Sequence, residues 1–334
     1  MKTSRLIGLF LVVFILGLSC SDSGREINVK QLQQRGDGLY YAVNEEKPYS
    51  GKVVELYESG QKRVERTYKN GKLHGLTTTW DYDGQKQSEV GYQNSIQSGP
   101  YRTWYDNGQQ QIEGIYEEGK RKGGWKYWTK DGEERQTGTV TDIDGNSYLT
   151  IGIGGKWWMA ENLKVTHYRN GDAIPNVTDD NAWSELNTGA YCSYDNDAAN
   201  AQTYGYLYNW YTVNNSSSLA PEGWHVPSDA EWQTLVDYLG GNDIAGGKLK
   251  QTGTTHWQSP NEGATNESYF SALPGGYRLS YGTFDTIGYL ADFWSSTKYD
   301  GHHAWFRFVY YDRSEVRSYN SNKHYGFSVR CVRD

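Results

Sequence analysis

The sequence predicts a mainly β protein, in which an elongated antiparallel β repeat is followed by an α+β domain. Glycine and aromatic residues recur every 24 residues between Gly36 and Gly138. After that stretch the period disappears, and amphipathic helix patterns stand among short apolar strands. The composition agrees, because 29 Tyr, 13 Trp and 39 Gly indicate short strands and tight turns, with half-buried aromatic rings covering thin cores.

The N-terminus has the order of a secretory signal. Two cations, an apolar run through Leu16 and a few small residues follow one another before Cys20. The apolar run is shorter than the about 20 residues that a membrane-spanning helix needs. We therefore predict that residues 1–19 are a signal peptide and that residues 20–37 are a linker.

Cys20 resembles the lipidated cysteine of bacterial lipoproteins, where the peptidase cuts before the cysteine and its thiol carries the lipid. The usual leucine three residues earlier is replaced by Gly17, and an ordinary signal with an incidental cysteine is the alternative. The resemblance implies lipidation of Cys20 and a location in the cell envelope. The outer membrane is the expected place, and the sequence leaves open whether the protein faces the cell surface or the interior of the envelope.

The charge of the exported chain narrows the class of partner. Cleavage before Cys20 removes Lys2 and Arg5 and leaves 31 basic residues against 40 acidic ones. An acidic chain is poorly suited to phosphate backbones and to anionic membrane surfaces. We therefore expect no nucleic-acid partner, and we expect membrane attachment through the lipid anchor alone.

The repeat occupies residues 38–138. Four ladders share its 24-residue spacing: Gly60, Gly84, Gly108 and Gly132; Gly51, Gly75, Gly99 and Gly123; Trp80, Trp104 and Trp128; and Tyr68, Tyr92 and Tyr116. Each unit reads as two short strands, with hairpin signals such as Asn107-Gly108. One unit cannot bury its aromatic residues alone, so the units are expected to stack into a β-solenoid or a twisted meander.

The repeat resembles the MORN-repeat variant of bacterial surface proteins and of proteins labelled YwqK-type antitoxins. The matching segments are Trp80-Asp81-Tyr82-Asp83-Gly84-Gln85 and Trp104-Tyr105-Asp106-Asn107-Gly108-Gln109. An exported chain cannot neutralise a cytoplasmic toxin, so the resemblance implies a MORN-like fold and no antitoxin role. We interpret the repeated Trp and Tyr as the core of the repeat, and an exposed row of tyrosines that binds a ligand is the alternative.

Residues 139–334 are predicted to form the α+β domain. A helix over Ser228–Leu239 begins with a capping box of Ser228 and Glu231 and stops at Gly240-Gly241. A second, shorter helix is expected from the spacing of Tyr204, Leu207, Tyr208 and Tyr211. Strands are expected over 305–310 and 327–332.

Six motifs in this region, in a consistent order, resemble the Fibrobacter succinogenes major paralogous (FISUMP) domain. They are Trp158-Met159-Ala160-Glu161-Asn162-Leu163, Tyr204-Gly205-Tyr206-Leu207-Tyr208-Asn209-Trp210, Gly223-Trp224-His225-Val226-Pro227-Ser228-Asp229-Ala230-Glu231-Trp232, Leu273-Pro274-Gly275-Gly276-Tyr277-Arg278, Phe293-Trp294-Ser295-Ser296 and Gly326-Phe327-Ser328-Val329-Arg330-Cys331. The resemblance implies a surface lipoprotein of the kind expanded in Bacteroidetes.

The Gly223–Trp232 stretch and the closing strand also look like formylglycine-generating enzymes, which implies a C-type-lectin-like α+β fold. Those enzymes bind copper through two cysteines just before the last strand, and residues 313–325 contain none. The required thiolates are missing, so we expect no enzymatic activity. For an exported chain we predict instead a disulfide between Cys192 and Cys331, with two free buried thiols as the alternative.

Five aromatic residues in the loop-rich half are candidates for stacking on sugar rings, with core packing as the alternative for each: Trp257, Tyr281, Trp294, Tyr299 and Trp305. The triplets of calcium-dependent sugar-binding lectins are absent, so glycan recognition has to use other residues.

No metal site and no cofactor are expected from the sequence. The histidines lack the spacing of metal ligands, and Ca²⁺ is the one metal ion for which the sequence offers candidate ligands. Asp195 and Asp197, and the triplet Asp179-Asp180-Asn181, offer oxygen atoms that suit this hard cation. Each of these stretches also reads as an ordinary polar turn.

These features predict a non-catalytic recognition or adhesion protein of the cell envelope. The lipid at Cys20 anchors it, the repeat acts as a stalk, and the C-terminal domain binds a glycan or a protein. The alternative is a structural or assembly component that meets other envelope proteins through the repeat.

Overall fold

A computed structural model describes residues 25–334, so the predicted signal peptide and Cys20 lie outside the described residues. The protein is mainly β, as the sequence predicts. Two compact units divide the chain, one up to Trp125 and one from Lys126 to Asp334. None of the helices in residues 25–334 combines the length and the apolar character of a membrane-spanning segment.

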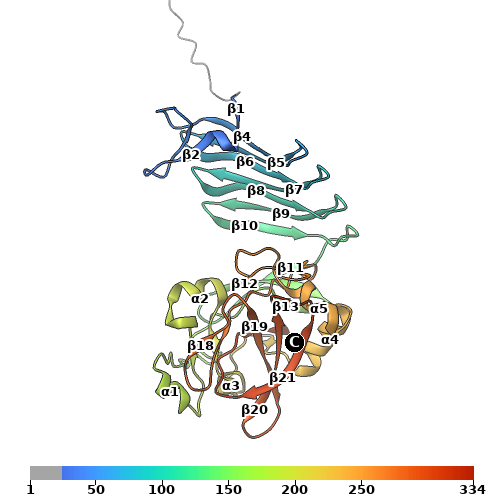
Figure 1. The fold of residues 1–334 in the computed structure, drawn as a ribbon. Helices are drawn as coiled ribbons and strands as arrows, with labels where there is room; N and C mark the ends of the chain where they lie inside the picture. Colours follow the sequence, from blue (N-terminus) through green and yellow to red (C-terminus); the bar gives the residue numbers. More distant parts are fainter. Residues whose placement is uncertain (1–24) are drawn as a thin grey trace, which may run out of the picture. The chain divides into compact units, whose positions relative to one another are not determined.

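The main sheet of the first unit has the strand order β1-β4-β5-β6-β7-β8-β9-β10 (Figure 1). β1 (Glu26–Asn28) pairs in parallel with β4 (Gly51–Leu56), and from β4 onward each strand neighbours the next one in sequence. The later strands are β5 (Lys62–Lys69), β6 (Lys72–Trp80), β7 (Lys86–Gln93), β8 (Ile96–Trp104), β9 (Gln110–Glu117) and β10 (Lys120–Tyr127). The repeat is therefore a meander and not a solenoid.

Each 24-residue period corresponds to one hairpin. Gly60, Gly84 and Gly108 have φ angles of 86°, 82° and 80° in the turns after β4, β6 and β8, a conformation that favours glycine over other residues. The strand pairing shifts register just before each of these turns, at Leu56, Trp80 and Trp104. The glycine and tryptophan ladders thus mark the turn and the irregularity beside it.

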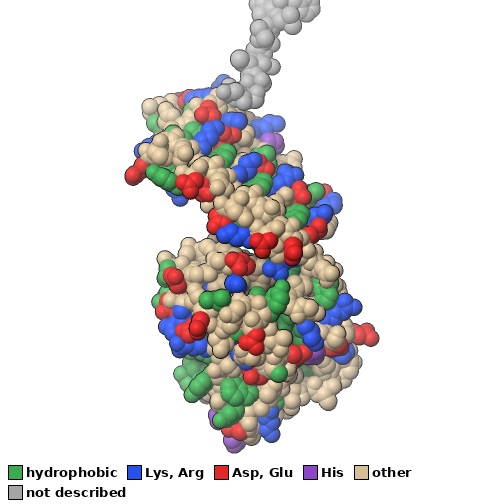
Figure 2. Space-filling model, turned by 90° about the vertical axis from the view of Figure 1, so that its right-hand side faces the viewer, with side chains coloured by type: hydrophobic (Ala, Val, Ile, Leu, Met, Phe, Trp, Pro, Cys, Tyr) green, Lys and Arg blue, Asp and Glu red, His purple; other side chains and the backbone are tan. Residues whose placement is uncertain are grey.

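Most of the repeated aromatic rings are half-buried, because they pack against one another along a single sheet. Tyr101 and Tyr116 meet edge to face at 5.7 Å, and Tyr116 meets Trp125 at 5.1 Å. Acidic and basic side chains are interspersed on the surface seen in Figure 2, with cross-strand pairs such as Lys52 and Glu65 at 2.7 Å. The sheet therefore combines aromatic contacts with a solvated, charge-balanced surface.

Residues 25–37 are folded, so the prediction of a linker is wrong for this part of 20–37. The 3-10 helix η2 (Val29–Gln31) follows β1, and β2 (Leu32–Gln34) pairs with β3 (Tyr40–Ala42). The physical reason is Ile27, which is buried in a small core with Tyr49, Val53 and Tyr68.

The second unit begins ahead of the expected boundary between residues 138 and 139. Tyr127 packs edge to face on Tyr269 at 4.8 Å, and Trp128 bridges to Glu134. Arg135 donates to the carbonyl of Glu267 at 2.8 Å. These contacts attach the stretch from Lys126 to the C-terminal unit.

Two larger sheets organise the second unit, with the strand orders β11-β12-β13-β22-β16 and β19-β20-β21. Their strands are β11 (Thr137–Thr141), β12 (Ser147–Ile153), β13 (Lys156–Met159), β16 (Trp224–His225), β19 (Leu290–Lys298), β20 (His303–Tyr310), β21 (Val316–Asn322) and β22 (Val332–Arg333). Two short ladders join β14 (Tyr191–Cys192) to β15 (Leu207–Tyr208) and β17 (Tyr277–Arg278) to β18 (Phe284–Asp285).

Five α-helices and one 3-10 helix complete the described part of this unit: α1 (Asp180–Ser184), η3 (Tyr194–Asn196), α2 (Ala198–Tyr204), α3 (Trp210–Val213), α4 (Asp229–Tyr238) and α5 (Asn242–Leu249). α4 confirms the predicted helix, since Ser228 is its N-cap and forms the capping box with Glu231. In Figure 1, α4 and α5 lie beside the β19-β20-β21 sheet, which they also contact.

The prediction of one helix through Tyr204 and Tyr211 is wrong. α2 ends at Tyr204, because its C-cap Gly205 has a φ of 79° and leaves the helical region. The next residues, Leu207 and Tyr208, then pair with β14, and a new helix starts after the N-cap Asn209. The helical spacing of the apolar side chains was therefore incidental, and strand pairing with distant residues decided the conformation.

Of the two strands predicted near the C-terminus, one is confirmed and the other is not. The strand over 305–310 is confirmed, because it lies within β20. The stretch 327–332 is not a continuous strand, since Phe327 and Ser328 make isolated bridges before β22 begins at Val332.

Candidate functional site

One face of the β19-β20-β21 sheet borders a pocket of about 620 Å³. Seven aromatic residues line it: Tyr277, Phe306, Phe308, Tyr310, Tyr319, Tyr325 and Phe327. Leu290 and six polar residues complete the lining: Ser280, Asp292, His303, Asn320, Ser321 and Asn322. We call this the aromatic pocket.

Strand alternation explains which side chains reach the aromatic pocket. Successive residues of a strand point to opposite faces, so Phe306, Phe308 and Tyr310 of β20 share the pocket face. Residues paired across two strands lie on the same face, and Asp292 of β19 pairs with Phe308. The register of two strands thus places one carboxyl group among aromatic rings.

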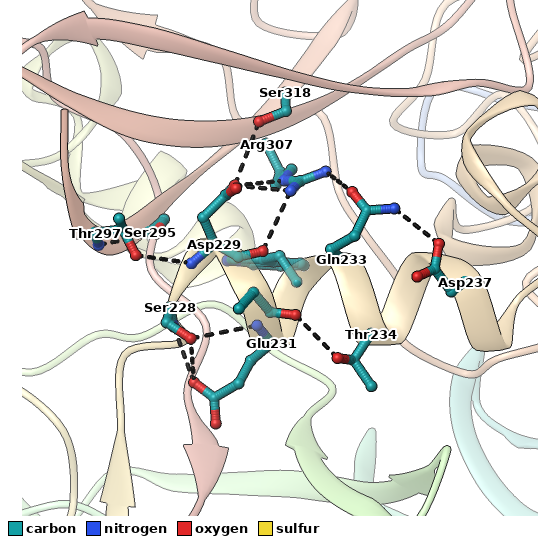
Figure 3. Close-up of polar contacts among 12 residues, drawn as sticks. Ser228, Asp229, Glu231, Gln233, Thr234, Asp237, Ser295, Thr297, Arg307 and Ser318 are labelled. Carbon is teal, nitrogen blue, oxygen red and sulfur yellow. Dashed lines mark hydrogen bonds and ion pairs between the residues drawn. The ribbon is translucent and has the colours of Figure 1, made fainter.

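The opposite face of β20 is held against α4 by Arg307 (Figure 3). Its Nη2 and Nε donate to Asp229 Oδ1 at 2.7 and 3.0 Å, and its Nη1 donates to Gln233 Oε1 at 2.9 Å. Ser318 of β21 donates to the same carboxylate oxygen at 3.3 Å. These bonds hold β20 and β21, two strands that border the pocket, against α4 on the side of the sheet away from the pocket.

Asp292 is the most unusual residue of the aromatic pocket. Its side chain is 2 % exposed, and its Oδ2 has no hydrogen-bond partner. Burial raises the pKa of this carboxyl well above its usual range, because the charged form loses its hydration. As a neutral acid it can donate one hydrogen bond, and as a carboxylate it can balance a cationic ligand.

Sequence reasoning missed Asp292. The signal was present, because Asp292 is a lone acid in the otherwise apolar run Leu290-Ala291-Asp292-Phe293-Trp294. A strand that is buried on both faces rarely contains an acid without a reason.

The raised pKa predicts how stability depends on pH. Between the unfolded pKa, near 3.8, and the higher folded pKa, the folded chain keeps a proton that the unfolded chain releases. The free energy of unfolding therefore falls as pH rises through this window, by up to about 1.4 kcal/mol for each pH unit. We expect Asp292→Asn to remove this slope and to be more stable relative to wild type at about pH 8 than at about pH 5.

Urea denaturation at several pH values measures this difference. The matched control is Asp285→Asn, which changes an exposed acid on β18 and should keep the wild-type slope. Parallel stability curves for wild type and Asp292→Asn would contradict the expectation.

The five aromatic candidates from the sequence separate into buried and exposed residues. Trp257 and Trp294 are buried, and their indole N–H groups donate to the carbonyls of Ala272 and Tyr208 at 3.1 and 2.8 Å. Their proposed role in stacking on sugars is therefore wrong, because core packing and backbone hydrogen bonds occupy both rings.

The other three candidates retain accessible ring surface. Tyr281 is 61 % exposed and directly follows Ser280, which lines the aromatic pocket. Tyr299 is 53 % exposed and meets the half-buried Trp305 edge to face at 5.2 Å. Tyr299 and Trp305 do not line the aromatic pocket, so the structure does not bring the three together.

The acidic stretches considered for Ca²⁺ serve local roles. Asp197 accepts from the backbone N–H of Ala199 as the N-cap of α2, and Asp195 is exposed. Asp179 caps α1, and Asp180 pairs with Arg278 at 2.9 Å. Within residues 25–334, no group of three or more His, Cys, Asp or Glu side chains is arranged to hold a metal ion.

The predicted disulfide between Cys192 and Cys331 is corrected by the structure, in which both are free buried thiols. They belong to different apolar clusters, Cys192 beside Trp183 and Cys331 in the larger core with Met159. Burial raises the pKa of Cys192 to about 12 and that of Cys331 further, so neither thiol ionises near neutral pH.

Alkylation tests this correction. In native protein both thiols are expected to be inert, and in denaturant without reductant both should be alkylated, as a mass shift of two adducts shows. A protein that gains no adduct until it is reduced would restore the disulfide.

Two comparisons with known proteins bear on this unit. The sequence model of the family described as Fibrobacter succinogenes major domain matches residues 151–333, which include every residue that lines the aromatic pocket. No curated protein matches the chain. Because the matched residues make up more than half of the chain, the protein belongs to the Fibrobacter succinogenes major domain family.

Proposed function

We propose that this protein is a non-catalytic recognition protein of the bacterial cell envelope, and that it binds a glycan through the aromatic pocket. The pocket carries the proposal. Its volume of about 620 Å³ lies within the range of about 300–1,000 Å³ of small-ligand sites. Aromatic rings can stack on the apolar faces of sugars, and Ser280, Asn320 and Asn322 supply polar groups for hydroxyls.

The proposal extends to the rest of the chain. A lipid at Cys20 would anchor it to the outer membrane, and the β meander, which resembles MORN repeats, would act as the stalk. The C-terminal unit would have a C-type-lectin-like fold related to formylglycine-generating enzymes, without their chemistry. The buried, protonated thiols of Cys192 and Cys331 support a non-catalytic role, since a thiolate is the form that binds copper or attacks a substrate.

Glycan arrays and pull-downs with cell-wall polysaccharides test the binding proposal. The protein would be residues 25–334, which contain all of the described structure. Tyr319→Ala removes a ring of the pocket that is 65 % exposed, so the fold should tolerate it. We expect about tenfold weaker binding for Tyr319→Ala, equivalent to about 1.4 kcal/mol of lost stacking.

The matched control is Tyr299→Ala, which removes an exposed ring outside the aromatic pocket and should bind as wild type does. Binding that depends on Tyr299 but not on Tyr319 would move the site elsewhere. Uniformly negative arrays and pull-downs would reject glycan recognition.

The envelope location has its own test. Replacing Cys20 with Ala should release the protein from the membrane fraction, because the acyl chains have no other attachment point. Protease treatment of intact cells should degrade the wild-type protein if it faces outward. A membrane-bound Cys20→Ala variant would contradict lipid anchoring.

One observation favours a second function, assembly of envelope proteins through the repeat. Leu76, Ile96 and Ile115 on β6, β8 and β9 are exposed apolar side chains, a feature of protein contact surfaces. Crosslinking in cells separates the two functions, because partners that map to residues 38–138 would favour assembly.

A further inference from the structure

We propose that the aromatic pocket selects saccharides that carry a free, protonated amine, and that Asp292 is the counter-ion of this ammonium group. The ligand class is an amino sugar without its N-acetyl group. This inference rests on the proposed glycan recognition and specifies which glycans are bound.

The first argument is the isolation of the Asp292 carboxyl group. Asp292 is the one acidic residue among those that line the aromatic pocket, and the lining contains neither Lys nor Arg. Its Oδ2 is buried without a hydrogen-bond partner. Buried polar atoms are almost always satisfied, so an unsatisfied acceptor in the wall of a pocket indicates a donor that arrives with the ligand.

The second argument is the character of the surrounding rings. Phe308 lies opposite Asp292 in the strand pairing, and Tyr277, Tyr310 and Tyr325 belong to the same lining. The faces of aromatic rings carry partial negative charge and attract ammonium groups. A carboxylate beside several rings therefore favours a cation over a neutral amide, and Tyr319 at the exposed side remains available for the sugar ring.

The third argument is the protonation of the free pocket. The lining holds four tyrosines, Tyr277, Tyr310, Tyr319 and Tyr325, and Asp285 pairs with Tyr277 on the neighbouring strand. One cation lies near these rings, the guanidinium of Arg313, which is 4.9 Å from the centre of the Tyr310 ring and pairs with Asp312 and Glu315. His303 also lines the aromatic pocket, and its Nδ1 lies 3.0 Å from both carboxylate oxygens of Asp300. Burial alone raises the pKa of Asp292, which favours the protonated carboxyl in the free pocket.

Binding of an ammonium group then requires Asp292 to ionise. The carboxyl O–H bond breaks, its proton passes to the buffer, and the carboxylate accepts hydrogen bonds from the ligand N–H groups. Below the pKa of Asp292 in the free protein, the affinity should rise with pH, by up to tenfold for each pH unit. Above that pKa the affinity should level off while the amine stays protonated.

Isothermal titration calorimetry of residues 25–334 tests the inference with three disaccharides of similar size: the glucosamine dimer, the N-acetylglucosamine dimer and the glucose dimer. Each titration is repeated in two buffers with different ionisation enthalpies, which counts the protons released. We expect the glucosamine dimer to bind at least about tenfold more tightly than the other two, with release of up to one proton.

Two variants assign the effect to Asp292. Asp292→Asn should lose the preference for the amine and the proton release, while Asp243→Asn, which changes an exposed acid on α5 outside the pocket lining, should keep both. Circular dichroism and Tm establish that both variants are folded. The proton count in the wild-type protein does not depend on any variant, so the inference stays testable if Asp292→Asn is unstable.

The outcomes separate this inference from the proposed function. Equal binding of the acetylated or neutral dimers would overturn the inference and leave glycan recognition standing. Binding of lysine-containing peptides in place of amino sugars would overturn it as well. Failure to bind these dimers together with every glycan of the arrays would reject both proposals.

Discussion

Replacing Arg330 with Met is expected to lower the free energy of unfolding of the C-terminal unit by about 3–5 kcal/mol. Arg330 is 1 % exposed, and its guanidinium is surrounded by acceptors. Nε donates to Asn162 Oδ1 at 2.6 Å, and Nη1 donates to the carbonyls of Met159 and Phe270 at 3.0 and 2.6 Å. Nη2 donates to the carbonyl of Ser271 at 3.1 Å.

The magnitude follows from the acceptors that the variant leaves behind. Methionine fills part of the volume but donates no hydrogen bond, so four acceptors inside the core lose their donor. Each acceptor that stays unsatisfied lowers the free energy of unfolding by about 1–3 kcal/mol. Relaxation of the loop that contains Phe270 and Ser271 recovers part of this cost. Arg330→Lys should be intermediate, since one ammonium group cannot reach all four acceptors.

Equilibrium unfolding in urea, followed by tryptophan fluorescence, measures the effect. Arg333→Met is the matched control, because Arg333 lies three residues later on β22 and is exposed. It should change the free energy of unfolding by less than about 0.5 kcal/mol. A loss of similar size in both variants would show that net charge, and not the buried hydrogen bonds, matters.

Local features of this fold could be predicted from the sequence. The capping box of Ser228 and Glu231 defines the start of α4 because both partners lie within one turn of helix. The glycines of the repeat mark hairpin turns because a positive φ is a property of one residue. In both cases the interaction that decides the structure lies within a few residues of the signal.

Features that depend on distant residues could not be predicted in the same way. Tyr204, Leu207 and Tyr208 have helical spacing, but pairing with β14 converts the second half into a strand. Ile27 looked like part of a linker, yet it packs on Tyr49, more than twenty residues away. Local periodicity does not reveal which surface a strand or a segment will meet.

The candidate site shows the same division. The alternation in β20 was visible, and it places Phe306 and Phe308 on one face and Arg307 on the other. Which face would border a pocket depended on α4 and on residues 277–292, so the sequence offered no means to choose. Trp257 and Trp294 looked like Tyr281 as ligand candidates, because composition does not separate a buried ring from an exposed one.

Asp229→Asn is expected to destabilise the C-terminal unit by about 2–4 kcal/mol and to weaken ligand binding in the aromatic pocket. The guanidinium of Arg307 is buried, and Asp229 is its carboxylate partner through two bonds to Oδ1. Breaking one side of a fully buried ion pair leaves an uncompensated charge and costs about 3–5 kcal/mol, whereas the Asp229 side chain is 28 % exposed. We expect the smaller loss of about 2–4 kcal/mol because Gln233 and the backbone carbonyl of Asp229 still accept hydrogen bonds from Arg307.

The effect on binding follows from the position of Arg307. It lies on β20 between Phe306 and Phe308, which line the aromatic pocket from the other face of the strand. Asp229 also accepts from Ser318 of β21, so its carboxylate connects both strands to α4. Losing this connection should loosen the two strands and raise the Kd of any pocket ligand, although no residue of the lining has changed.

Asp237→Asn is the matched control, since Asp237 lies on the same helix and its carboxylate accepts from Gln233 and not from Arg307. It should change stability by less than about 0.5 kcal/mol and leave the Kd unchanged. A double-mutant cycle with Asp229→Asn and Arg307→Met should give a coupling energy of about 2 kcal/mol between the pair. Equal stability and equal Kd for Asp229→Asn and Asp237→Asn would contradict the argument, because the helix would then hold the pocket strands by apolar packing alone.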